Sequence, residues 1–108
     1  MANPYRNEVS VTLNGTEYLL RPTFTCLAEI EEQIGKTIFQ FMAYFLANGI
    51  KAKDAYFILE CGIKAAGGKV DKEELQRNMS EGGLNGVVSA IDSFLNAAVM
   101  AGDNIKKN

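Results

Sequence analysis

Histidine and tryptophan are absent from this chain, and cysteine and proline each occur only twice in its 108 residues. Histidine is the side chain best suited to proton transfer near neutral pH and the commonest metal ligand. Without it, and with no activated Cys or Ser setting, the sequence offers no combination of nucleophile, base and orienting group. We therefore expect no catalytic residues, metal ligands, cofactor or small-molecule substrate.

An excess of positive charge is also missing. The chain has 11 basic and 13 acidic residues, a formal net charge of -2, so no overall positive potential attracts a phosphate backbone. A helix-turn-helix whose recognition helix spans residues 71–79 would present Glu73 and Glu74 beside Lys72 and Arg77. A small DNA-binding regulator is therefore a less favoured alternative, and we expect no nucleic-acid partner.

The two cysteines and the apolar runs bear on the cellular compartment. Cys26 and Cys61 lie far apart in apolar helical patterns, which indicates free, buried thiols in a reducing compartment. The first residues include no apolar segment of a secretory signal. The longest charge-poor stretch, residues 82–102, has Asp92 in its middle and makes a poor membrane span. We expect a soluble protein of a reducing compartment, without membrane contact.

A β-hairpin is the first structure that the sequence predicts. Residues 8–21 alternate in polarity around Asn14-Gly15, the dipeptide that accepts the positive φ angles of a type I′ turn. This turn pairs Leu13 with Thr16, Val11 with Tyr18 and Val9 with Leu20, which makes one face almost wholly apolar. Two strands alone are marginal, so this face must lie against helices or against strands of another chain.

Apolar residues at helical spacing then predict helices over about 23–34, 37–47, 54–66, 71–80 and 84–101. Thr23, Thr37 and Asp71 are the expected N-caps. The fold class is thus α+β, an N-terminal β-hairpin followed by a bundle of four to five α-helices. We expect one domain over residues 1–102 and a disordered tail over 103–108.

The helix over residues 37–47 lacks charge altogether, and its apolar residues cover an arc of about 160°, wider than one core requires. We expect its core face to consist of Ile38, Met42, Phe45 and Leu46. The remaining aromatic residues, together with one from the following helix, are the candidate partner-binding residues: Phe39, Phe41, Tyr44 and Phe57. The apolar face of the last helix is expected to comprise Leu84, Val87, Val88, Ile91, Phe94, Leu95, Ala98 and Val99.

Several short motifs resemble the gene transfer agent tail protein family. They lie over roughly residues 3 to 67 and comprise Asn3-Pro4, Glu8-Val9, Leu13-Asn14-Gly15, Tyr18, Leu20-Arg21-Pro22-Thr23-Phe24, Leu27, Glu29-Ile30-Glu31, Gly35, Ile58-Leu59, Gly62-Ile63 and Ala65-Ala66-Gly67. This is a small phage-like family whose gene lies between the major tail protein and the tape measure. It is classed with tail assembly chaperones and is sometimes labelled a tail tube protein.

The resemblance implies a non-enzymatic, cofactor-free protein that acts by contact during assembly of a phage, prophage or gene transfer agent tail. The implied location is the cytoplasm of the bacterial host cell, with association with the virion as an alternative. The implied partners are other tail proteins, namely the tape measure and the major tail protein, and self-association is left open. As a chaperone, the protein would cover apolar stripes of a helical tape measure until tail subunits displace it. The alternative is a structural tail tube component whose hairpin pairs with neighbouring strands.

Overall fold

The computed structural model describes the backbone of residues 7–106 and the side chains of residues 7–100. An antiparallel hairpin of β1 (Val9–Leu13) and β2 (Thr16–Leu20) precedes five helices. The helices are α1 (Phe24–Ile34), α2 (Ile38–Asn48), α3 (Ala52–Ala65), α4 (Lys72–Glu81) and α5 (Leu84–Lys106). The predicted α+β class is therefore confirmed.

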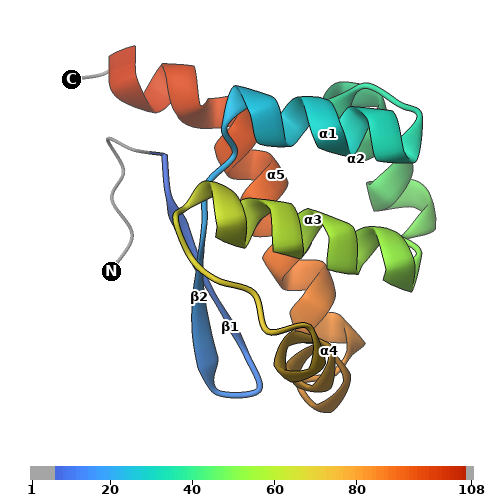
Figure 1. The fold of residues 1–108 in the computed structure, drawn as a ribbon. Helices are drawn as coiled ribbons and strands as arrows, with labels where there is room; N and C mark the ends of the chain where they lie inside the picture. The colour runs from blue at the N-terminus through green and yellow to red at the C-terminus, as the bar shows by residue number, and fades with distance from the viewer. Residues whose placement is uncertain (1–6, 107–108) are drawn as a thin grey trace.

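The hairpin has the predicted register. Leu13 pairs with Thr16, Val11 with Tyr18 and Val9 with Leu20. Asn14 and Gly15 have φ angles of 52° and 80°, as the tight turn requires. The apolar face is covered by helices of the same chain, since α5 packs on β1 and α3 on β2 (Figure 1).

Helices α1, α2 and α4 begin directly after their predicted N-cap residues. The hydroxyl groups of Thr23 and Thr37 accept hydrogen bonds from backbone N–H groups, and so does the Asp71 carboxylate. Helix α3 begins two residues before the predicted start, after Lys51, whose side chain makes no capping bond. No side-chain signal marks that start in the sequence.

The last helix is longer than predicted. Helix α5 passes Gly102 and ends at Lys106, so residues 103–106 of the expected tail have helical backbone. One glycine lowers helix propensity by only about 1 kcal/mol and is not a sufficient stop. Residues 107–108 of the expected tail lie outside the described residues, as do residues 1–6.

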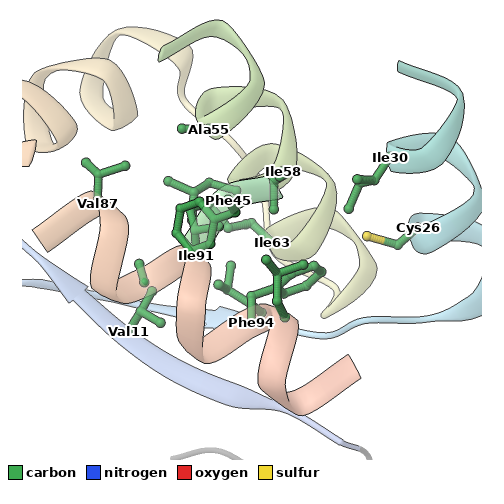
Figure 2. Close-up of a cluster of buried hydrophobic side chains, with 14 of the residues drawn as sticks. Val11, Cys26, Ile30, Phe45, Ala55, Ile58, Ile63, Val87, Ile91 and Phe94 are labelled. Carbon is green, nitrogen blue, oxygen red and sulfur yellow. The ribbon is translucent and has the colours of Figure 1, made fainter. Parts of the chain in front are cut away.

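One hydrophobic core joins all the elements (Figure 2). The largest fully buried side chains come from the hairpin, α1, α3, α4 and α5, and they are Leu13, Leu20, Ile30, Ile58, Leu59, Leu75, Ile91, Phe94 and Leu95. At the centre, α3 closely approaches both β2 and α5: a Cβ added to Gly62 would lie 3.0 Å from Phe94 Cε1 and 3.2 Å from Leu20 Cβ. The absence of a side chain at Gly62 thus allows α3 to pack closely against both β2 and α5.

A polar network joins the hairpin turn to α4. The buried Asn78 donates to the Tyr18 hydroxyl at 2.7 Å and accepts from the Asn14 amide at 3.2 Å. The Asn14 amide also donates to Glu81 at 3.0 Å. A buried amide is costly unless it is hydrogen-bonded, so this network fixes α4 against the end of the hairpin.

Candidate functional site

Helix α2 has a buried face that differs from the predicted one. Phe41 is 3% exposed, and its ring stacks on that of Phe45 with centroids 6.0 Å apart. Leu46, expected in the core, is 75% exposed. The prediction was wrong for both residues because α2 lacks charged residues, so its polarity pattern does not define which part of its wide apolar arc faces inward.

The exposed side of α2 presents a stripe of two large apolar residues, Phe39 and Leu46, which we call the α2 stripe. Phe39 is 70% exposed. The two residues are seven positions apart, so they lie within about 20° of each other on the helix surface. Large exposed apolar side chains that share one helix face are candidates for a contact surface.

Tyr44 is exposed, as expected, but does not belong to this stripe. Five positions separate it from Phe39, which places the two about 140° apart around the helix. The Lys36 ammonium lies 4.7 Å from the centre of the Tyr44 ring, a cation–π contact that occupies one face of the ring. The four candidate residues therefore do not form a single patch.

Phe57, the fourth candidate, is partly buried and lines a groove of about 890 Å³ between α1 and α3. The groove is lined on both helices by carboxylates, those of Glu29, Glu32 and Glu60, and by Lys64. Lys64 lies 3.7 Å from Glu60 in an i,i+4 ion pair. We call this the acidic groove. In the sequence, only the glutamates of α1 indicate this groove.

Both thiols lie in this groove and are poorly ionised. Burial raises the pKa of Cys26 to about 12, with a further contribution from Cys61 beside it. Burial also raises the pKa of Cys61 to about 11, and the Glu29 carboxylate, which accepts from its Sγ at 3.7 Å, adds to the effect. Because the thiolate is the nucleophile, these cysteines are unsuited to nucleophilic catalysis near neutral pH.

We expect Cys61 in the folded protein to react with iodoacetamide at neutral pH roughly a hundredfold more slowly than in denaturant, since its pKa is raised from 9.0 to about 11. Mass spectrometry of timed samples measures both rates. Equal labelling rates in the folded and denatured states would contradict the expected burial.

The raised pKa values of Cys26 and Cys61 also make stability depend on pH. The free energy of unfolding should fall as the pH rises above about 9, because unfolded thiols then release protons that folded ones retain.

A second groove, of about 790 Å³, lies between the end of α2, the first half of α3, α4 and the start of α5. We call it the α4–α5 groove. Leu84 and Val88, predicted on the core face of α5, are 77% and 42% exposed and line this groove, whereas Val87 and Ile91 are buried as expected. The start of α5 therefore has more apolar side chains than the core covers.

Within the described residues, no three His, Cys, Asp or Glu side chains are arranged to hold a metal ion. No single helix there is long and apolar enough to cross a membrane. Helix α4 and the Leu84–Met100 part of α5 pass that test together, by length and composition only, and are bent by 113° at their junction. The candidate functional features described on residues 7–100 are surfaces, namely the α2 stripe and the two grooves.

A family model described as phage tail tube protein, GTA-gp10, matches residues 6–101, nearly the whole chain. The chain belongs to this family. Comparison with curated proteins finds no match, and neither does comparison with solved structures. Membership of the GTA-gp10 family supports a structural or assembly role in a phage-like tail, with other tail proteins as partners.

Proposed function

We propose that this member of the GTA-gp10 family is a non-enzymatic tail assembly chaperone that binds the tape measure or tail subunits in the cytoplasm of the bacterial host. The observation that carries the proposal is the α2 stripe. Phe39 and Leu46 are exposed on one side of a helix whose opposite side holds Phe41 and Phe45 in the core. The core keeps α2 in place while its outer side stays open to a partner.

The size of this surface suits transient binding. A tape measure with helical apolar stripes needs cover only until tail subunits polymerise around it, so the chaperone must later be displaced. Small interfaces with a few apolar anchors bind with moderate affinity, whereas permanent assemblies generally bury more area. Two large apolar side chains on one helix are in keeping with the first kind of contact.

The alternative is a structural tail tube component, a term that the family description contains. A two-stranded hairpin has strand edges to which neighbouring strands can add. Mass spectrometry of purified tails separates the two functions. A tube component should be present at a fixed ratio to the other tail proteins, and a chaperone should be missing.

Co-expression with the neighbouring tape measure tests the chaperone function. We expect the wild-type protein to increase the soluble fraction of the tape measure and the double variant Phe39→Ser/Leu46→Ser to lose most of this effect. Both side chains are largely exposed, so the free energy of unfolding should change by no more than about 0.5 kcal/mol for each substitution. Soluble and insoluble fractions are compared by quantitative immunoblotting.

Phe24→Ser is the matched control, because Phe24 is an equally large, exposed side chain on a different helix. It should retain the solubilising effect. A tape measure that stays insoluble with the wild-type protein would reject the chaperone function toward the tape measure. Retention of the effect in the double variant would reject the α2 stripe as its surface.

A further inference from the structure

The α4–α5 groove is lined more by apolar side chains than the acidic groove is. Its lining includes Ile50, Tyr56, Met79, Leu84, Val87 and Val88. Figure 2 shows Val87 on α5 and Ala55 on α3 at the α4 end of the core, and these two buried residues line the groove as well. The groove is thus continuous with the core and is held on several sides by packed helices.

The outer part of the groove carries charge of one sign. Lys53 from α3 and Lys72 from α4 line it, and no Asp or Glu among residues 7–100 does so. The acidic groove differs in this respect, since Glu29, Glu32 and Glu60 line it.

The shape of the apolar surface fits a helix. Leu84 and Val88 are four residues apart on α5, so they form a ridge of the kind that packs between i and i+4 side chains of a second helix. A partner helix bound in this way would bury its apolar stripe against Met79, Leu84 and Val88. Acidic residues flanking that stripe would then lie near Lys53 and Lys72.

From this juxtaposition of an apolar groove with lysines at its edge, we propose that the α4–α5 groove binds an acidic amphipathic helix of a partner tail protein. The inference rests on the proposed function and adds a second contact surface besides the α2 stripe, together with the chemistry of the partner segment that it receives. Opposite charges at the edge of such an interface mainly select the partner and speed association, while the apolar floor supplies most of the affinity. A basic amphipathic helix of the same apolar content would be disfavoured by repulsion from the two lysines.

Fluorescence anisotropy with two labelled peptides tests the proposal. Each peptide is an amphipathic helix of roughly 20 residues with one leucine stripe, flanked by glutamates in the first and by lysines in the second. We expect the glutamate peptide to bind the full-length protein roughly tenfold more tightly at low salt, and the difference to shrink in high salt because exposed charges are screened.

Two variants locate the binding. Lys53→Glu/Lys72→Glu should reverse the preference between the peptides, and Leu84→Ser/Val88→Ser should weaken both peptides by roughly tenfold. Lys36→Glu/Lys69→Glu changes the net charge equally but lies outside the groove, so it should keep the wild-type preference. Circular dichroism checks that every variant keeps its fold. Equal binding of the two peptides, or binding unaffected by Leu84→Ser/Val88→Ser, would overturn the proposal.

Co-expression with the tape measure separates this inference from the function on which it rests. If the wild-type protein fails to solubilise the tape measure, the chaperone function toward the tape measure fails even when the peptides bind as expected. If the wild-type protein succeeds and the Leu84→Ser/Val88→Ser variant succeeds equally, the chaperone function stands and the groove is not its partner site. Loss of the effect in this variant, with retention in Lys36→Glu/Lys69→Glu, supports both.

Discussion

Phe41→Ser is expected to lower the free energy of unfolding by about 3–5 kcal/mol or more, whereas Phe39→Ser should change it by no more than about 0.5 kcal/mol. Phe41 is buried and stacks on Phe45, so its removal leaves a cavity and also buries a hydroxyl. Phe39, two positions earlier on the same helix, is mostly exposed. The two substitutions remove the same side chain from opposite sides of α2.

Urea unfolding followed by far-ultraviolet circular dichroism measures both values, since the chain has no tryptophan to report by fluorescence. A small domain of this kind has a total stability of about 5–15 kcal/mol, so Phe41→Ser should shift the midpoint strongly or prevent folding. Similar losses for both variants would mean that α2 is rotated about its axis relative to the described packing. The assignment of the α2 stripe would then be wrong.

Phe94→Ala is expected to lower the free energy of unfolding by about 3–5 kcal/mol, because Phe94 on α5 is fully buried, with its ring close to Gly62 of α3. Gly62→Ala should cost about 1–3 kcal/mol for the opposite reason, overpacking. The new methyl group would lie 3.0 Å from Phe94 Cε1 and 3.2 Å from Leu20 Cβ, and both neighbours are held in the core.

The double variant Gly62→Ala/Phe94→Ala should be destabilised by less than the sum of the two single changes. Removal of the Phe94 ring eliminates the closest contact with the new methyl group, which can then occupy part of the cavity. A double-mutant cycle from urea unfolding gives this coupling energy, expected at about 0.5–3 kcal/mol for residues in contact. Strict additivity would show that Gly62 and Phe94 do not contact each other.

Local signals explain why the hairpin and most helix starts were predictable from sequence. The Asn14-Gly15 turn and the alternating pattern on either side give the same register, and a shift by one residue would turn the whole apolar face to solvent. Thr23, Thr37 and Asp71 cap their helices through bonds to residues three positions later. The start of α3 was misplaced because no capping side chain marks it.

The candidate contact surface was only partly predictable. Phe39 and Tyr44 are exposed as expected, but Phe41 belongs to the core, and Leu46, Leu84 and Val88 were expected in the core and are exposed. In each case the sequence contains more apolar residues than one face needs. Only the position of the neighbouring elements determines which of them remain uncovered.

By itself, the sequence determined the α+β class, the hairpin register and the positions of the helices, because turns, caps and apolar periodicity are properties of residues near one another in the chain. The tertiary structure decided the rotation of α2, the close approach at Gly62, the network around Asn78 and the two grooves of opposite charge. These features depend on which surfaces meet when distant segments pack, and the finite area of a small core leaves some apolar side chains outside it.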